Sequence, residues 1–211
     1  MTFDPALRKA YESITTATIT TILLKKGLRN VGLRGPKPLR GGPSATAGRL
    51  VGPAFTLRFV PAREDLATPA SWSSPTSTRA AIEEMPEGGT DGGVRERGGP
   101  RARGLPVWCS GGAAPPSVAG LTFVGCQQPV GCGGVAVFPD DLVVCDRDGA
   151  VVVPKELITE VAELGLEQER LEAWIMKEVE QGAKLPGLYP INEENRARYE
   201  ADSARSDDGK D

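Results

Sequence analysis

The sequence contains no histidine among its 211 residues. This absence excludes a serine or cysteine nucleophile activated by histidine, a histidine general base and a histidine metal ligand. Any chemistry must therefore rely on carboxylates, arginine, lysine, tyrosine, cysteine, backbone amides or a hard metal ion. Aromatic residues make up only 5% of the chain, so we expect an aliphatic core.

Long apolar runs are also absent. No run approaches the roughly 18 apolar residues of a membrane helix, and the polar start MTFDPALRKAYESI lacks the apolar segment of a signal peptide. The four cysteines form no CxxC motif and lie in or beside apolar segments, which favours buried, reduced thiols over a zinc site. We therefore expect a cytoplasmic protein that does not bind a membrane.

The charge balance has no strong basic excess. A net charge of −3 and a pI near 5.3 argue against direct nucleic-acid binding through a broad basic face. The local exception is a cluster of four arginines, Arg95, Arg97, Arg101 and Arg103. A solvated basic loop is favoured over an anion-binding patch for this cluster.

The pattern along the chain predicts one domain over 1–195 and a charged, disordered tail over 196–211. Capping and apolar spacing predict helices over 5–12, 15–26 and 155–183. Residues 28–50 are typical of a loop, 51–60 of a strand, and 64–104 of a region with one helix over 77–85 and almost no strand. Three apolar runs, 135–138, 142–145 and 150–153, predict a strand meander with tight turns.

Known phosphate-binding motifs are missing: there is no GxxxxGK[ST] loop and no GxGxxG after a strand. The aspartates at 140, 141, 146 and 148 offer oxygen ligands for a hard cation, but their hairpin positions favour turn formation. Arg95-Glu96 lies in a glycine-rich stretch before an apolar strand start. The arginine fork matches an oxo-acid carboxylate, and the neighbouring carboxylate is a ligand type that Mg²⁺ or Mn²⁺ accepts.

Five segments carry a resemblance to a known family. They are FTLRFVPARED (55–65), EEMPEG (83–88), GLPVWCSGGAAPPSVAGL (104–121), GGVAVFPDDLVVCDRDGAVVVP (133–154) and LEAWIMKEVEQGAKLPGLYP (171–190). With them the chain resembles the RraA-like family, which includes 4-hydroxy-4-methyl-2-oxoglutarate aldolases and the regulator of ribonuclease activity A. The resemblance implies an α/β fold, a swivelling β/β/α domain with N-terminal helices and a long C-terminal helix, assembled into trimers or hexamers.

The resemblance also implies a metal-dependent lyase that cleaves 4-hydroxy-2-oxo acids or decarboxylates oxaloacetate to give pyruvate. Arg95 matches the substrate-binding, catalytic arginine of the family motif. Glu96 replaces the aspartate that helps to hold the divalent cation, Mg²⁺ or Mn²⁺. Because glutamate is one methylene longer, the metal geometry is expected to shift.

The chain departs from the family pattern near residues 88–91. Roughly 40 residues that family members have there, about one strand-helix-strand unit, are absent from this sequence. The upstream acidic partner would fall at Ser74, which is not a carboxylate. Two alternatives to a lyase therefore stay open. One is a non-catalytic regulator that binds a ribonuclease, and the other is an inactive remnant.

Overall fold

The computed structural model describes residues 3–38, 49–63, 65, 89–91, 107–111 and 120–207. Within these residues, four helices and several small sheets make up a mixed α/β fold. The helices are α1 (Pro5–Ser13), α2 (Thr16–Lys25), α6 (Ile158–Glu180) and α7 (Glu193–Asp207), with a 3₁₀ turn, η3 (Lys155–Leu157), before α6.

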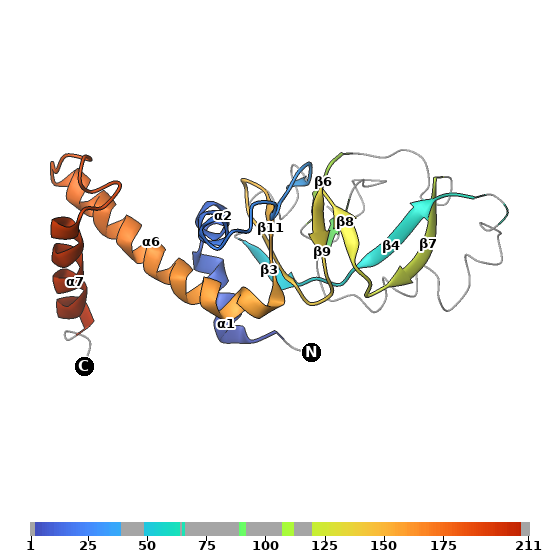
Figure 1. The fold of residues 1–211 in the computed structure, drawn as a ribbon, viewed down its shortest axis with the longest axis horizontal. Coiled ribbons are helices and arrows are strands. Elements are labelled where there is room, and N and C mark those ends of the chain that lie inside the picture. The colour runs from blue at the N-terminus through green and yellow to red at the C-terminus, as the bar shows by residue number, and fades with distance from the viewer. Residues whose placement is uncertain are drawn as a thin grey trace.

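A four-stranded antiparallel sheet, called the core sheet below, lies at the centre of the molecule. Its order is β1 (Gly32–Leu33), β11 (Ala150–Val153), β10 (Leu142–Cys145) and β3 (Leu50–Pro53). Helices α1 and α2 lie beside it, and α6 leads away from it towards α7 at one end of the molecule (Figure 1).

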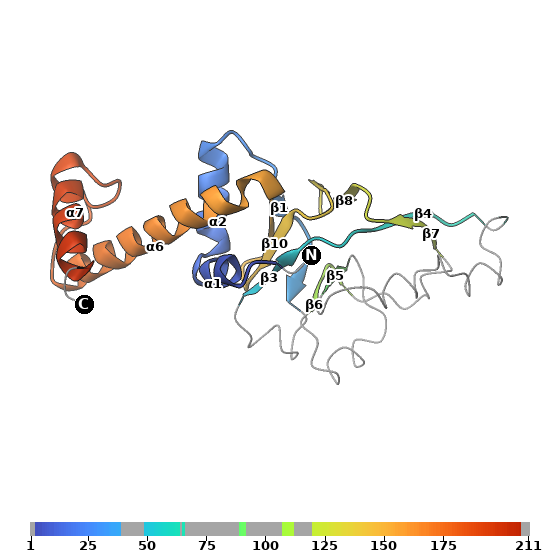
Figure 2. The same ribbon diagram turned by 90° about the horizontal axis from the view of Figure 1, so that it is seen from below.

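The other strands of the described residues form three smaller sheets. The first has the order β2 (Lys37–Pro38), β6 (Val107–Cys109) and β5 (Gly89–Asp91). The second, called the ribbon below, pairs β4 (Leu57–Pro61) with β7 (Leu121–Cys126). The third pairs β8 (Val130–Cys132) with β9 (Val135–Val137). The ribbon extends from the sheet region at the end opposite α7 (Figure 2).

Strands β10 and β11 are buried on both faces because their side chains alternate between two clusters. Leu142, Val144, Val151 and Val153 pack with α1, α2 and α6. Val143, Cys145, Ala150 and Val152 face a second cluster that contains Trp108 of β6 and Val135 of β9. Continuous apolar runs suit strands that are covered on both sides, which explains the sequences LVVC and AVVV.

The predicted N-terminal helices are confirmed with their caps. The Asp4 carboxylate accepts a hydrogen bond of 2.8 Å from the Ala6 amide at the start of α1. The Thr15 hydroxyl accepts one of 3.0 Å from the Thr18 amide at the start of α2. Gly27 ends α2 with a φ of 86°, a conformation that glycine adopts without a steric penalty.

The strand predictions need four corrections. The expected loop over 28–50 contains β1 and β2, and the expected strand over 51–60 is divided into β3 and β4. Strand β5 lies inside the region predicted to have almost none. The predicted meander holds for β10 and β11, but β9 pairs with β8 instead of β10. The helix predicted over 77–85 lies outside the described residues.

The C-terminal end also differs from the expectation of a disordered tail over 196–211. Residues 193–207 are helical, and 208–211 lie outside the described part. Helix α7 folds back on α6 through a small apolar cluster of Leu171, Ile175, Leu188 and Tyr199. One buried tyrosine in an otherwise charged helix is a weak apolar pattern, which is why composition alone pointed to disorder. The single domain over 1–195 stays a prediction.

Candidate functional site: the carboxyl edge of strands β5 and β6

The candidate site lies where strands β5 and β6 end. The two strands pair in parallel, with Thr90 opposite Trp108 and Asp91 opposite Cys109. Parallel pairing places both carboxyl ends at one edge of the sheet, the edge where ligands bind in many α/β proteins. Arg95 and Glu96 follow the end of β5 by a few residues in sequence, but both lie outside the described residues.

Strand β6 is held in place by a buried tryptophan. Trp108 is 1% exposed and packs in the second apolar cluster. Its indole Nε1 donates a hydrogen bond of 2.9 Å to the backbone carbonyl of Asp146, which follows β10. Strand β6, which ends at the candidate site, is therefore hydrogen-bonded to the residue that follows β10 of the core sheet. This contact could not be predicted from the sequence, because nothing near Trp108 indicates a partner that lies 38 residues later.

The turn before β2 comes close to the end of β6. Gly35 has a φ of 109°, and a Cβ atom placed on it would lie 2.7 Å from the Ser110 hydroxyl oxygen. On the same side, β2 pairs with β6 so that Lys37 is opposite Cys109. A Cβ at position 35 would make the Ser110 hydroxyl shift, and the positive φ favours glycine, so glycine suits this position in conformation and in space.

The carboxylate of Asp146 organises the β10–β11 turn. It accepts hydrogen bonds from the Thr16 amide (3.0 Å), the Thr16 hydroxyl (2.9 Å) and the Asp148 amide (2.9 Å). Asp141, which is 5% exposed, accepts from the amides of Phe138 (2.8 Å) and Lys155 (3.2 Å). These bonds confirm the turn interpretation of both aspartates. Among the described residues no three His, Cys, Asp or Glu side chains are grouped to hold a metal ion.

The four cysteines differ in their exposure to solvent. Cys109 and Cys145 are buried as expected, whereas Cys126 at the end of β7 is exposed, which corrects the expectation that all are buried. Burial raises the pKa of Cys145 to about 12, and the nearby charges of Asp146 and Cys132 add to the effect. A thiol with such a high pKa is a poor nucleophile, so Cys145 is a core residue.

No helix in the described ranges is long and apolar enough to cross a membrane.

One comparison with known proteins covers the segment that contains β5 and β6. A family model described as RraA-like, "Aldolase/RraA", matches residues 89–152. The matched interval begins at β5, includes Arg95 and Glu96, and ends in β11. A Halalkalibacterium halodurans protein named "Putative 4-hydroxy-4-methyl-2-oxoglutarate aldolase" is 38% identical over 66 residues. The match covers 31% of this chain and 30% of that relative, so the chain spans under a third of the relative's length in this match.

Two solved structures resemble the fold over most of the chain. One is described as an unusual member of the RNase ES inhibitor RraA protein family from Streptomyces coelicolor. It is 29% identical with a TM-score of 0.65, and the match covers 82% of this chain and 97% of that one. The other is an uncharacterized protein from Pseudomonas syringae pv. tomato, 20% identical with a TM-score of 0.68, covering 90% and 99% of the two chains. The second likeness shows the fold alone.

Proposed function

We propose that the chain is a lyase that releases pyruvate from a 4-hydroxy-2-oxo acid, from oxaloacetate, or from both, and the match of the RraA-like family model to residues 89–152 supports this proposal. The observation that carries this proposal is the parallel pairing of β5 with β6 inside the matched interval. That pairing brings the carboxyl ends of both strands to one edge of the sheet, and Arg95 follows the end of β5 in the sequence. A 4-hydroxy-4-methyl-2-oxoglutarate-type substrate agrees with the name of the curated relative.

Arg95 is the residue that we propose to bind the substrate. Its planar guanidinium group can donate two parallel hydrogen bonds to the carboxylate of a 2-oxo acid. In aldol cleavage the C3–C4 bond breaks, the C4 hydroxyl loses its proton, and the electron pair passes to the pyruvate enolate, which is then protonated at C3. A fixed cation beside the substrate stabilises the negative charge that develops on the oxo oxygen. Arg95 would therefore act in both binding and catalysis.

Glu96 is the proposed ligand for a divalent cation, Mg²⁺ or Mn²⁺. Mg²⁺ commonly binds proteins through one or two carboxylates and keeps several water molecules. Among the described residues no three His, Cys, Asp or Glu side chains are grouped around a possible metal position, and Asp141 and Asp146 already accept backbone hydrogen bonds. They therefore do not form a complete metal site. A bound cation would supply positive charge next to the substrate oxygens.

The test measures pyruvate release from oxaloacetate and from 4-hydroxy-4-methyl-2-oxoglutarate, with Mg²⁺ and with a chelator. We expect Arg95→Gln to lower kcat/KM by about 100-fold, the loss typical of removing one group that stabilises an oxyanion. Arg97→Gln removes the same charge two residues away and should leave the rate unchanged. Equal rates for wild type and Arg95→Gln would overturn the assignment. Rates that do not change with the chelator would overturn the proposed cation.

A regulator that binds a ribonuclease is the second candidate function. It is favoured by the 29% identity to the Streptomyces coelicolor protein, which extends over 97% of that chain. The matching assay adds the purified protein to a ribonuclease E-type enzyme and measures the RNA cleavage rate. Inhibition that persists in Arg95→Gln, with no pyruvate release from wild type, would support the regulator. Absence of both activities would leave an inactive remnant.

Assembly into a trimer or hexamer is part of both proposals. The carboxyl edge of β5 and β6 lies beside the core sheet and away from the arm formed by α6 and α7 (Figure 2). A neighbouring subunit at this edge could add groups that one chain does not supply. Light scattering coupled to size-exclusion chromatography gives the mass directly, and a mass near 22.3 kDa, that of a single chain, would contradict this part.

A further inference from the structure

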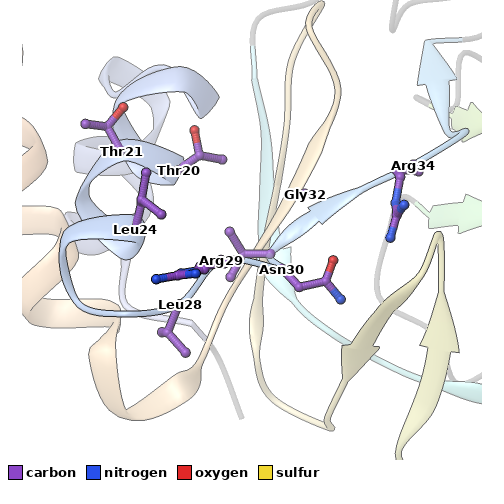
Figure 3. A pocket seen from close by; sticks show the side chains of 9 residues that line it. Thr20, Thr21, Leu24, Leu28, Arg29, Asn30, Gly32 and Arg34 are labelled. Atoms are coloured by element: carbon purple, nitrogen blue, oxygen red, sulfur yellow. The ribbon is translucent and has the colours of Figure 1, made fainter.

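Two features of the described surface lie apart from the candidate site: a hollow beside α2 and the arm formed by α6 and α7. The hollow has a volume of about 450 Å³. Figure 3 shows the side chain of Arg29 turned towards α2 and that of Arg34 at the other end of β1, so the two cations do not meet at one point. The arm differs from the hollow, because it joins two helices through a small apolar cluster.

Helix α7 packs on the distal half of α6 and lies away from the core sheet (Figure 1). The cluster between the two helices contains Leu171 and Ile175 of α6, Leu188 of the linker and Tyr199 of α7. Within the described residues, the buried cluster formed by α1, α2 and the core sheet shares no member with it. The core can therefore stay packed when α7 moves.

The chain between α6 and α7 has an exposed joint at Lys184. Before it, the Ala183 amide still donates a hydrogen bond of 3.0 Å to a carbonyl of α6. After it, the Leu185 carbonyl accepts hydrogen bonds of 3.0 Å from two amides further along, and the Gly187 carbonyl accepts one of 2.9 Å from the Asn192 amide. Residues 185–207, called the cover below, therefore form a unit that Lys184 connects to α6.

Buried side chains and hydrogen bonds hold the cover on α6. Leu188 is 2% exposed and Tyr199 is 4% exposed, and Tyr199 is the one buried side chain over residues 193–205 of α7. The Tyr199 hydroxyl donates a hydrogen bond of 3.0 Å to the Glu167 carboxylate, and the Trp174 indole donates one of 3.1 Å to the Asp202 carboxylate. Within α7, the packing therefore depends mainly on one tyrosine.

A surface contact adds to this attachment. Arg198 of α7 forms an ion pair with Glu178, and its guanidinium group lies 5.6 Å from the centre of the Trp174 ring. The Arg198 side chain is 50% exposed, and an ion pair that solvent reaches contributes little to stability. A helix of 15 residues is marginal in water without tertiary packing. Helix α7 therefore depends on a weak contact.

The first half of α6 is held much more firmly. Val161 and Ala162 are buried and pack with buried residues of α1 and α2. The amide of Thr15, directly before α2, also donates a hydrogen bond of 2.8 Å to the Glu169 carboxylate. Parts of a protein with few buried contacts open at a lower free energy than its core. The cover is the part of the arm that meets this condition.

We propose that the cover is a conformational device that opens as one unit about Lys184 while the core stays folded. In the closed form it lies over a stripe of α6 that consists of Leu171, Trp174 and Ile175. These positions lie at i, i+3 and i+4, so they share one face of the helix, and opening exposes this apolar face. The proposal is independent of the lyase function, because the residues proposed for catalysis belong to neither the cover nor α6.

Hydrogen exchange of the full chain, followed by mass spectrometry, measures the opening. We expect the amides of α7 to exchange at least about 100-fold faster than those of residues 158–170 of α6. Protection should be similar along α7, because the whole helix opens at once. Protection that falls steadily towards residue 207 would mean fraying from the end of the chain and would overturn the proposal. Equal protection in α7 and in residues 158–170 would overturn it as well.

Tyr199→Ala removes the buried side chain of α7. It should speed exchange in α7 at least about tenfold, because burial of a large apolar side chain is lost, and it should leave exchange in β10 and β11 unchanged. Arg196→Gln changes an exposed position of the same helix and should behave as wild type. Faster exchange in β10 and β11 of Tyr199→Ala would mean that the cover opens only with the core, which contradicts the proposal.

Tyr199→Phe serves if the alanine variant does not fold. It keeps the ring and loses the hydrogen bond to Glu167, so exchange in α7 should rise at least about twofold. Exchange in α7 that stays at the wild-type rate in both variants would mean that Tyr199 does not hold the cover closed, and it would overturn the proposal.

Cysteine labelling shows whether opening exposes the stripe. Ile175 is 6% exposed and its neighbour Met176 is 58% exposed. A maleimide should modify Ile175→Cys at least about tenfold faster in the Tyr199→Ala background, and it should modify Met176→Cys at the same rate in both backgrounds. Peptide mapping separates these positions from the four native cysteines. A rate at position 175 that does not respond to Tyr199→Ala would overturn the proposal.

Discussion

The core sheet and the ribbon are built from similar residues but are packed very differently. In the core sheet, all four residues of β11 are buried, and helices cover one face while β6 and β9 cover the other. In the ribbon, Val60, Leu121 and Val124 are between 38% and 46% exposed, and the main ring contact is Phe59 against Phe123 at 5.6 Å. A two-stranded sheet without a covering layer is only marginally stable in water. The contribution of an apolar strand to the stability of this protein therefore depends on how many of its faces are covered by other elements.

The largest contrast between the two regions should appear in thiol reactivity. Burial, reinforced by the charges of Asp146 and Cys132, raises the pKa of Cys145 in the core sheet from 9.0 to about 12. At pH 8 its thiolate is then about 1,000-fold rarer than that of a thiol with the unshifted pKa, since three units separate the two values. Cys126 at the end of the ribbon is exposed. We expect iodoacetamide to modify Cys126 at least about 100-fold faster than Cys145.

Peptide mapping by mass spectrometry measures both rates in one sample, and urea-unfolded protein provides the control in which the two should react alike. The raised pKa also has a consequence for stability. The contribution of protonated Cys145 is fully present below about pH 9 and is lost as the pH rises towards about 12. Equal native rates at pH 8 would mean that the core sheet opens as readily as the ribbon.

The next largest contrast concerns side-chain truncation. Leu142 in β10 is fully buried between Val153 and Pro53 of the neighbouring strands. Leu142→Ala should lower the free energy of unfolding by about 2–5 kcal/mol, because it leaves a cavity in a packed core. Val124→Ala on the ribbon, 46% exposed, should change it by less than about 0.5 kcal/mol. Urea unfolding of both variants checks the difference, and a similar loss in both would show that the ribbon is covered in solution.

The same contrast explains what the sequence could and could not predict. Strands β10 and β11 were predictable because their continuous apolar runs are separated by an Asp-rich turn, and the Asp4 cap and the Gly27 stop marked two helices. Strands β1, β2 and β5 have two or three residues each. This is too few for an alternation of apolar and polar residues to be recognised in the sequence. Their formation depends on partners distant in sequence, such as Ala150 and Val151 for β1.

The candidate site was predictable only as a pair of residues. Arg95 and Glu96 stood out in the sequence through their chemistry, and Arg95 through its match to the family motif. The parallel register of β5 and β6, which brings the carboxyl ends of these two strands to one edge, involves strands separated by residues 92–106. The hydrogen bond from Trp108 to the Asp146 carbonyl likewise uses a backbone group that no side-chain pattern identifies. Such non-local contacts are determined by the assembled fold and leave little trace in local sequence.

The smallest predicted effect concerns α6, one of the helices that cover the core sheet and have no counterpart on the ribbon. Gly165 in α6 is buried, and a Cβ placed on it would lie 2.7 Å from Cδ1 and 2.9 Å from Cγ2 of Ile14. Alanine favours a helix by about 1 kcal/mol over glycine, but Ile14 is 0% exposed and has little room to move. Overpacking of a dense core costs about 1–3 kcal/mol. We therefore expect Gly165→Ala to lower the free energy of unfolding by about 1 kcal/mol.

Gly120, directly before β7 of the ribbon, gives the matched control, because a Cβ there would meet no atom within 4 Å. Gly120→Ala should leave the free energy of unfolding within about 0.5 kcal/mol of wild type. A stabilised Gly165→Ala variant would mean that α6 can move away from α1 at little cost. In that case the close approach at Gly165 would not be what fixes the helical layer on the core sheet, and the difference between the two regions would depend on the strands alone.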